Sequence, residues 1–488
     1  MNRLRQMISI HNLTYIVIGL VSFVLLVIYW RQKKSEGRER KRLKSFIVFL
    51  DHVFYEYTIS QCVEEAILKS LEFVDMEIQE MAEKFYDLLM LEDVEELRNV
   101  KKEYSCSYYY QFAMYSYLAM EYGDASEKAI FLDNVTFLKK QIFIWVLNRE
   151  KLEHNLAGLM LVVLTPIEFL KAIEVWARWN LGELSRYYQG TYGVVTRFLL
   201  VFATIFCYQA VLMLRQNYDV HFFKSNLLTV LAGNRFVVVV YDWWTEHHPK
   251  KVRRFTLLLR KSSSRVSLKE FFVLRLGAFV LVGVLSFVIL VPIAKDTRTY
   301  VVLLIAAIFL MGIIASYMPV WFLEVRLQLM NRQKEDEAYF YYGVSRMVAL
   351  GGNGDVYDIL NWLELGGEIF VPTIQVCMDE FSYDNEEALE HGKRLEPFVP
   401  FVKLLDAFMV SEVIGLEQAL EPIMLELDSH IEKRKQDNEI STANKGVLGR
   451  FIAFIPMVCV IGLYLIVPFV LESLVQLQGY VKQIQAGF

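Results

Sequence analysis

The chain has 488 residues, of which 55 per cent are hydrophobic and 22 per cent are charged, and its formal net charge is −5. Soluble proteins are about 45–50 per cent apolar and about 25 per cent charged. The composition therefore excludes intrinsic disorder, a collagen-like repeat and a secreted disulfide scaffold, and the weakly acidic balance gives no indication of nucleic-acid binding. Because the apolar excess is gathered in long runs, the sequence indicates a membrane protein with large water-soluble parts.

Six stretches are long and apolar enough to be transmembrane helices, each of which needs about 20 residues. The weakest, residues 155–173, contains Glu168 and Lys171 near its end. These two residues are three apart on one helical face, where they can form an ion pair. Trp176 and Trp179 follow, as expected of aromatic residues at a membrane interface. The other five stretches are residues 14–30, 198–214, 271–294, 300–323 and 451–471.

The distribution of Lys and Arg orients these spans, because cytoplasmic loops carry the excess of positive charge. A dense basic run at residues 31–44 follows the first span, so this side is expected to face the cytoplasm. Residues 215–270 hold eleven Lys and Arg against four Asp and Glu. If residues 31–44 and 215–270 are both cytoplasmic, an even number of spans must lie between them. Residues 155–173 and 198–214 together give two, so residues 155–173 are counted as a span. The sequence thus predicts six spans, both termini outside, and no cleavable signal peptide.

The soluble mass then lies almost entirely on the cytoplasmic side, in residues 31–154, 215–270 and 324–450. Apolar residues recur there at intervals of three and four, which indicates amphipathic helices. The opposite faces are acidic, since residues 51–97 hold fourteen Asp and Glu against two Lys. We therefore predict an all-α polytopic membrane protein with about six transmembrane helices and two cytoplasmic helical bundles.

Seven segments follow from this interpretation. They are an N-terminal membrane anchor (1–30), a first cytoplasmic helical domain (31–154), a membrane helix pair (155–214), a basic cytoplasmic linker (215–270), a membrane hairpin (271–323), a second cytoplasmic helical domain (324–450) and a C-terminal membrane helix with a short tail (451–488). One order of features occurs twice: an acidic helical region, a helix of mixed charge, and a span that contains proline, Pro166 in the first half and Pro456 in the second.

No nucleotide-binding, hydrolase or zinc-protease motif occurs in the chain, so the sequence predicts no catalytic residue, no cofactor and no metal. The glycine-rich residues 350–355 lack the Lys-Ser/Thr of a phosphate loop and are expected to end a helix. His247 and His248 have no further ligand close in sequence, and the five cysteines form no C-x-x-C pair. Glu168 and Lys171 could mark an ion path, but their position near the end of a span favours a structural pair.

Two charged surfaces remain open to interpretation. The acidic helical faces could dock a basic partner or could simply be solvated. Residues 250–269 carry eight Lys and Arg, which could bind anionic membrane lipid, as clusters beside a span do. The same residues could equally act only as a topology signal.

From residue 253 onward the order of features resembles that of a known family. Residues 253–272 (RRFTLLLRKSSSRVSLKEFF) precede a pair of spans, residues 319–350 lead into a helical region, and residues 401–456 end in the final span. This order resembles the F domain of the inner-membrane platform proteins of type II secretion systems and of type IV and tight-adherence pilus machines. The resemblance covers residues 253–472, about 45 per cent of the chain.

The most specific part of the resemblance is the element Glu412-x-x-Gly415-Leu416-x-x-Ala419-Leu420. The resemblance implies a platform protein of the bacterial inner membrane that is not an enzyme. Its cytoplasmic domains would dock on a hexameric assembly ATPase, and its spans would receive pilin or pseudopilin subunits. It also implies a homo-oligomer, and residues 31–154 as a more divergent F-like domain in which Tyr122-Gly123-Asp124 is only a faint counterpart. The implied partner-docking residues are Glu412, Gly415, Leu416, Glu417, Ala419 and Leu420.

Each of these residues also has a plainer interpretation. Gly415 is expected to allow close packing of two helices, and Glu412 could orient the bundle or contact the ATPase, or be an ordinary exposed acid. A polytopic transporter or a membrane scaffold remains the alternative function. A transporter should have charged residues in several spans, whereas these spans are nearly free of charge. A membrane-bound enzyme would need a cluster of histidines or carboxylates at one depth, but the eight histidines are scattered.

Overall fold

The structure is a computed structural model, and it describes residues 10–91, 94, 97–98, 101, 107–123, 129–215, 226–261, 266–290, 298–351 and 354–486. Within these ranges every regular element is a helix, which confirms the predicted all-α class. The chain divides into two compact units. The first, which we name the membrane unit, comprises residues 1–31, 152–330 and 443–488; the second, named the helical unit, comprises residues 32–151 and 331–442.

Five stretches of helix in the described part of the chain are long and apolar enough to cross a membrane. The weakly predicted span 155–173 lies inside one of them. Another predicted span, residues 271–294, corresponds to helix α15 (Leu268–Leu290), which is not among the five; its last four residues lie outside the described ranges, and it stays a prediction. The five stretches are Tyr15–Ser60, Ile130–Ala177, Tyr192–Arg215, Ile308–Gly351 and Leu416–Val481.

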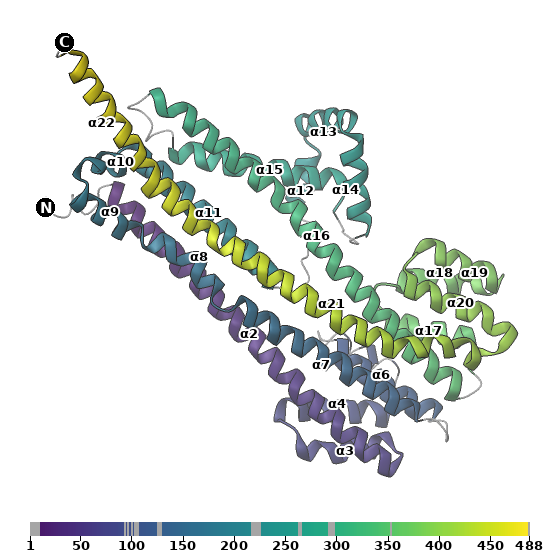
Figure 1. The fold of residues 1–488 in the computed structure, drawn as a ribbon. Helices are drawn as coiled ribbons and strands as arrows, with labels where there is room; N and C mark the ends of the chain where they lie inside the picture. The colour runs from purple at the N-terminus through teal and green to yellow at the C-terminus, as the bar shows by residue number, and fades with distance from the viewer. Residues whose placement is uncertain are drawn as a thin grey trace. The chain divides into compact units, whose positions relative to one another are not determined.

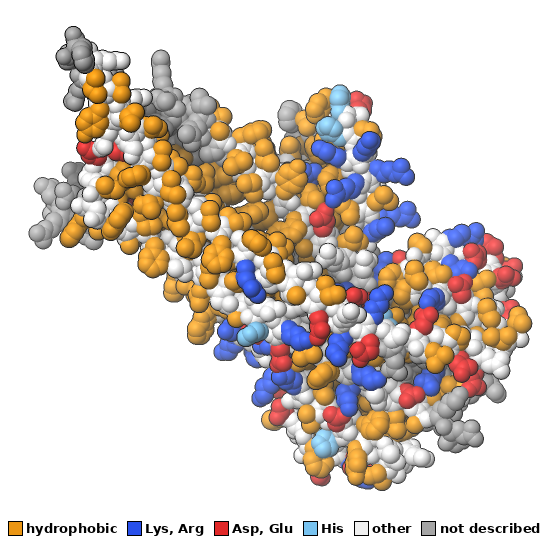
Figure 2. Space-filling view, viewed as in Figure 1, with side chains coloured by type: hydrophobic (Ala, Val, Ile, Leu, Met, Phe, Trp, Pro, Cys, Tyr) orange, Lys and Arg blue, Asp and Glu red, His pale blue; other side chains and the backbone are white. Residues whose placement is uncertain are grey.

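The membrane unit is built from long apolar helices joined by short ones. Helix α8 packs against α11. Helix α11 also contacts α2, because the hydroxyl of Tyr208 in α11 donates a hydrogen bond of 2.8 Å to the carbonyl oxygen of Leu25 in α2. The visible face of this unit is largely apolar (Figure 2), as expected of helices that contact lipid. Parts of four long helices belong to it: α2 (Ile10–Ser60), α7 (Ile130–Leu156), α16 (Arg298–Gly351) and α21 (Leu416–Cys459). Its other helices, most of which Figure 1 labels, are α8 (Leu159–Glu168), α9 (Leu170–Asn180), the 3-10 helix η2 (Gly182–Leu184), α10 (Ser185–Gln189), α11 (Thr191–Arg215), α12 (Asn226–Ala232), α13 (Arg235–His247), α14 (Pro249–Lys261), α15, the π-helix η4 (Val460–Ile466) and α22 (Val467–Ala486).

The helical unit is organised around α6 (Ser107–Tyr122), which has apolar residues on every side. Residues 108–119 of this helix are all buried, so it occupies the centre of the unit rather than its surface. The other helices that belong wholly to this unit are α3 (Val63–Ser70), α4 (Met76–Leu91), α17 (Val356–Gly366), α18 (Val371–Phe381), α19 (Asn385–Leu395) and α20 (Val399–Ile414). Parts of α2, α7 (Ile130–Leu156), α16 and α21 (Leu416–Cys459) complete it.

The two predicted cytoplasmic domains are not separate bundles in the structure, because both contribute to the one hydrophobic core of the helical unit. The ring of Tyr115 in α6 lies 5.6 Å from that of Phe340 in α16. Asn134 in α7 donates a hydrogen bond of 3.3 Å to the carbonyl oxygen of Gly343. A Cβ at Gly343 would lie 2.7 Å from the Tyr115 hydroxyl, so the close approach of α16 to α6 requires a glycine. The first half covers apolar surface that the second half could not bury alone.

The duplicated order of features is present in the helices. In the first half α7 is followed by α8, which contains Pro166; in the second half α21 runs on through Pro456. Each of these long helices comes after a glycine with positive φ, Gly123 at +73° and Gly415 at +87°. Asp124, the last residue of the faint first-half counterpart, lies outside the described residues. The two halves therefore share a helix order although their sequences differ.

Candidate functional sites

The predicted docking element forms a helical hairpin. Helix α20 ends at Ile414, α21 begins at Leu416, and the two lie side by side (Figure 1). Gly415 has φ +87° and ψ 153°, a conformation that only glycine adopts readily, and its N–H donates to the carbonyl oxygen of Ser411 at 2.9 Å. The predicted close-packing role of Gly415 is wrong, because a Cβ there would meet no atom within 4 Å. The glycine is required by the backbone conformation of the turn.

The residues of the element divide into buried and exposed sets. Ala419 and Leu420 are part of the core of the helical unit, and Leu416 packs against that core. Glu412 and Glu417 are exposed, and Glu412 accepts a hydrogen bond of 3.2 Å from the side chain of Asn385. The buried residues hold the hairpin, and only the exposed ones are available to a partner.

Two salt bridges fix the direction of the hairpin. Lys403 in α20 lies 2.6 Å from the Glu426 carboxylate in α21. Lys393 in α19 lies 2.8 Å from Asp406 in α20, and this hydrogen bond is the main cause of the raised pKa of the Lys393 ammonium. The exposed Lys403–Glu426 pair contributes about 0–1 kcal/mol, so it orients the two helices more than it stabilises them.

Apolar side chains are exposed at the end of the hairpin beside its acids. Val413 is 85 per cent exposed, and Val410 and Ile414 are also exposed. We name Val410, Glu412, Val413, Ile414 and Glu417 the hairpin tip. Single exposed apolar residues are ordinary on a protein surface, but an apolar group flanked by carboxylates has the composition of a protein contact with a basic, partly apolar partner.

The membrane unit holds a polar cluster that the sequence analysis missed. The side chain of Glu174 in α9 is 0 per cent exposed and that of Arg197 in α11 is 1 per cent exposed, with Arg197 Nη1 3.8 Å from Glu174 Oε2. Lys171 Nζ lies 3.6 Å from Glu174 Oε1. The predicted pairing of Lys171 with Glu168 is therefore wrong: Glu168 is exposed, and the partner of Lys171 is the buried Glu174.

Two tyrosines complete the buried polar cluster, which comprises Tyr15, Glu174, Arg197 and Tyr464, with the partly exposed Lys171 at its edge. The hydroxyl of Tyr15 in α2 donates to the Glu174 carboxylate and lies 2.9 Å from the hydroxyl of Tyr464. The Arg197 guanidinium and the Lys171 ammonium both lie over the Tyr15 ring, at 5.0 and 4.6 Å from its centroid. A buried charge is costly unless it is paired, and here the Glu174 carboxylate is paired with both Arg197 and Lys171 and accepts the hydroxyl of Tyr15.

Two irregular features of the backbone position the cluster. Helix α8 ends at Glu168 and α9 restarts at Leu170, so the predicted span 155–173 is not one continuous helix. Tyr464 belongs to the π-helix η4, and π-helical turns are rare and frequent at functional sites. Glu174 and Arg197 lie just beyond the predicted spans 155–173 and 198–214. A search for charges inside the apolar windows therefore could not find them.

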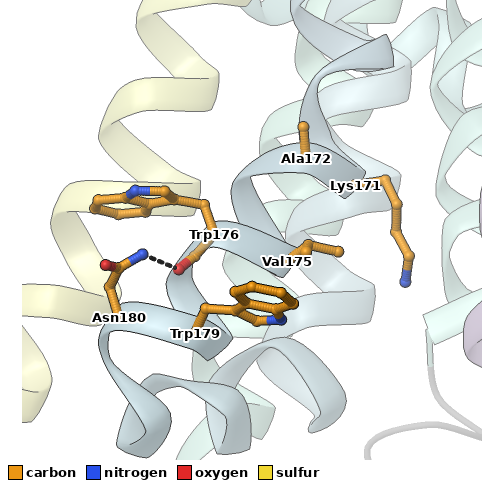
Figure 3. A pocket seen from close by; sticks show the side chains of 6 residues that line it. All are labelled: Lys171, Ala172, Val175, Trp176, Trp179 and Asn180. Atoms are coloured by element: carbon orange, nitrogen blue, oxygen red, sulfur yellow. Dashed lines mark hydrogen bonds between the residues drawn. The ribbon is translucent and has the colours of Figure 1, made fainter.

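The outer face of α9 forms a shallow apolar groove beside the cluster (Figure 3). Trp176 and Trp179 project from it and are exposed, and the Asn180 side chain donates a hydrogen bond of 2.8 Å to the carbonyl oxygen of Trp176. Exposed tryptophans at the end of an apolar helix are typical of a membrane interface. The groove is lined by Lys171, Ala172, Val175, Trp176, Trp179 and Asn180.

The described residues contain no group of three or more His, Cys, Asp or Glu side chains that could hold a metal ion. His247 ends α13, and its ring stacks on that of Trp243 with the centroids 4.7 Å apart. The glycine-rich residues 350–355 do end a helix, as predicted: α16 stops at Gly351, and Asp355 caps α17 by accepting the N–H of Asp358 at 2.8 Å.

Comparisons with known proteins give no further assignment. No protein-family model, no curated protein and no solved structure matches the chain.

Proposed function

We propose that this protein is an inner-membrane platform protein of a type II secretion system or of a type IV or tight-adherence pilus machine. The observation that carries the proposal is the hairpin tip. It lies within the most family-like part of the sequence, where Gly415 turns the chain from α20 into α21. Its exposed valines and carboxylates suit contact with another protein, and no metal cluster among the described residues competes with a binding role.

In this function the hairpin tip docks on the cytoplasmic assembly ATPase. Opposite charges on two partners increase the rate at which they associate and fix how they align, more than they increase the affinity of the complex. Helix α21 continues from the hairpin for 44 residues to Cys459 and enters the apolar stretch that contains Pro456. The chain that forms the hairpin thus leads directly into a predicted span, where pilin or pseudopilin subunits would be taken up.

The proposal assigns a location to each unit. The helical unit faces the cytoplasm, the membrane unit lies in the bacterial plasma membrane, and both termini lie outside. The protein acts as a homo-oligomeric scaffold without catalytic chemistry. The repeated order of a glycine with positive φ, a long helix and a proline-bearing span supports a duplicated F-like architecture, although Gly415 directly precedes α21 and Gly123 lies seven residues before α7.

The test is photo-crosslinking in the cell from the hairpin tip. A photoreactive amino acid at Val413 should give a covalent complex with an assembly ATPase. The same amino acid at the exposed Met76 of α4, in the first half of the helical unit, is the control and should give none. The charge reversals Glu412→Lys and Glu417→Lys should together abolish the complex while the protein level stays unchanged. Glu432→Lys, an exposed site further along α21, is the matched control.

The docking role would be lost if Val413 captured only other copies of this chain and the double charge reversal left filament assembly intact. In that case the transporter alternative gains weight, because the buried polar cluster supplies the intramembrane charges that such a protein needs. Reconstituted vesicles with a pH-sensitive dye inside distinguish the two functions. A proton path through Glu174 would give a flux that Glu174→Gln abolishes, whereas a platform protein gives no flux in either form.

A further inference from the structure

Helix α14 is the most basic element of the membrane unit. It has six Lys and Arg in 13 residues and no Asp or Glu. All six side chains are exposed, and Figure 2 shows Lys and Arg gathered over α13 and α14. We name them the basic row: Lys250, Lys251, Arg253, Arg254, Arg260 and Lys261.

The apolar side of α14 fixes its position beside two predicted spans. Phe255 and Leu259 are buried against Phe271 of α15 and Leu323 of α16, and the rings of Phe255 and Phe271 are 5.6 Å apart. Phe271 is the first residue of the predicted span 271–294, and Leu323 is the last residue of the predicted span 300–323. Helix α14 therefore packs against the first turn of α15 and the middle of α16, at the two residues where the predicted spans meet their cytoplasmic side.

Aromatic contacts hold the neighbouring helix α13 in the same place. The Trp244 ring lies 5.1 Å from that of Phe272 and 6.3 Å from that of Phe255. On the open side, Trp243 is 57 per cent exposed and Leu257 is 49 per cent exposed. Tryptophan and leucine beside a row of cations are the composition of a helix that lies in a membrane interface.

The acids around the basic row do not neutralise it. Glu324 of α16 pairs with Arg254 at 2.9 Å, and this is the one ion pair that the described residues provide for the row. On α13, Asp242 and Glu246 are exposed and form no ion pair with the row among the described residues. On α15, the Glu270 carboxylate accepts the backbone N–H of Ser267 at 2.8 Å. At least five cations therefore face outward at the membrane boundary.

We infer that α14 binds the anionic phospholipid headgroups of the leaflet at its end of the spans. The basic row has the charge opposite to that of the headgroups. The apolar contacts with Phe271 and Leu323 hold α14 beside the ends of the predicted spans, which is the depth at which headgroups lie. Each Lys or Arg close to an anionic surface favours binding about fivefold. This binding adds to the proposed function and does not depend on it, since it concerns how the membrane unit is seated in its bilayer.

The experiment uses the full-length protein in nanodiscs made with equal amounts of phosphatidylglycerol and phosphatidylcholine. After gentle extraction into detergent, native mass spectrometry gives the ratio of the two lipids that remain bound. The wild-type protein should retain phosphatidylglycerol in excess. Replacing Lys250, Lys251, Arg253 and Arg260 by Gln should lower that excess about tenfold or more, and raising the salt concentration should lower it in the wild type as well.

The matched control keeps the charge and changes the side chain. Lys250→Arg combined with Lys251→Arg should retain the wild-type ratio, because headgroup binding at this surface depends on charge. An unchanged ratio in the Gln variant would overturn the inference and leave the basic row as a topology signal or a site for an acidic macromolecule. A loss in the Arg variant as large as in the Gln variant would also overturn it, because the effect would then be structural.

Discussion

Gly415 shows how one residue can set the shape of a candidate site through its backbone conformation. Its φ of +87° with ψ of 153° lies in a region that is essentially restricted to glycine, and no heavy atom lies within 4 Å of an added Cβ. A side chain at this position therefore has space but a strained backbone. The cost of holding another residue there is about 1–3 kcal/mol.

We predict that Gly415→Ala lowers the free energy of unfolding by about 1–3 kcal/mol. The control is Gly37→Ala, also with open space around it but inside α2, where alanine should be neutral or stabilising by up to about 1 kcal/mol. Thermal unfolding of the purified full-length proteins in detergent measures both. If the two variants unfolded at the same temperature, backbone strain would not be the reason for the glycine.

Cys377 in α18 is a buried thiol with no reactive environment. Burial is the main cause that raises the pKa of this thiol to about 11. The thiolate is the reactive form, so at pH 8 only about 0.1 per cent of Cys377 is able to react. A Cβ at Gly392 would lie 2.4 Å from the Cys377 sulfur, so α19 leaves it little room.

We predict that Cys377 resists alkylation at pH 8 in the folded protein and reacts fully after denaturation. Because the pKa is raised, its rate should still be increasing with pH between about 9 and 11, above the range of an ordinary thiol. Peptide mass spectrometry after timed treatment with iodoacetamide measures the rate. Gly392→Ala should increase labelling by forcing the sulfur and its neighbours apart, and rapid labelling of the unaltered protein at pH 7 would contradict the prediction.

At the scale of elements, one carboxylate organises the connection between α17 and α18. Glu337 in α16 accepts the backbone N–H groups of Glu368, Ile369 and Phe370 at 2.9–3.0 Å, and the hydroxyl of Tyr341 at 2.9 Å. These N–H groups come just before and at the first turn of α18, where a helix favours a negative charge. The connection is therefore fixed by a side chain about thirty residues earlier in the chain.

We predict that Glu337→Ala lowers the free energy of unfolding by about 3 kcal/mol, because three backbone donors lose a charged acceptor together. The matched control is Glu364→Ala, which removes an exposed carboxylate with a single side-chain partner, Gln375, and should cost about 0.5 kcal/mol or less. Chemical denaturation of the full-length proteins gives both values. Equal losses would mean that Glu337 acts as an ordinary surface acid.

At the scale of the whole molecule, each unit is held by contacts between residues far apart in the chain. In the helical unit the two halves share one core, so neither half is expected to be stable alone. The close approach of Gly343 to Tyr115 joins them: a Cβ there would lie 2.7 Å from the tyrosine hydroxyl and 3.1 Å from the Asn134 side-chain oxygen.

We predict that Gly343→Val destabilises both halves together, by about 1–3 kcal/mol from overpacking. Limited proteolysis of the full-length protein should cut residues 32–151 and 331–442 with the same increase in rate. The control Gly37→Val places the same side chain on α2 in open space and should leave the cleavage pattern unchanged. Increased cleavage in only one half would show that the halves are independent domains.

Local patterns were sufficient to predict the helices and the hairpin. Apolar residues at intervals of three and four predict the helices of residues 324–450, whereas the role of Gly415 as the turn between α20 and α21 was not predicted, since close helix packing was expected there. The basic residues at 250–261 are also evident from the sequence. These features depend on neighbours along the chain, which is why they could be predicted without a structure.

The sequence by itself determined the all-α class, the apolar stretches and the residues of the hairpin, because helix periodicity and apolar length are local properties. Only the tertiary structure decided that Lys171 pairs with Glu174, since that choice depends on Tyr15 and Arg197 arriving from other helices. It also decided that the two halves share one core, because which apolar faces pack together depends on contacts between segments far apart in the chain. Tyr15 and Glu174 are 159 residues apart, and only packing brings them together.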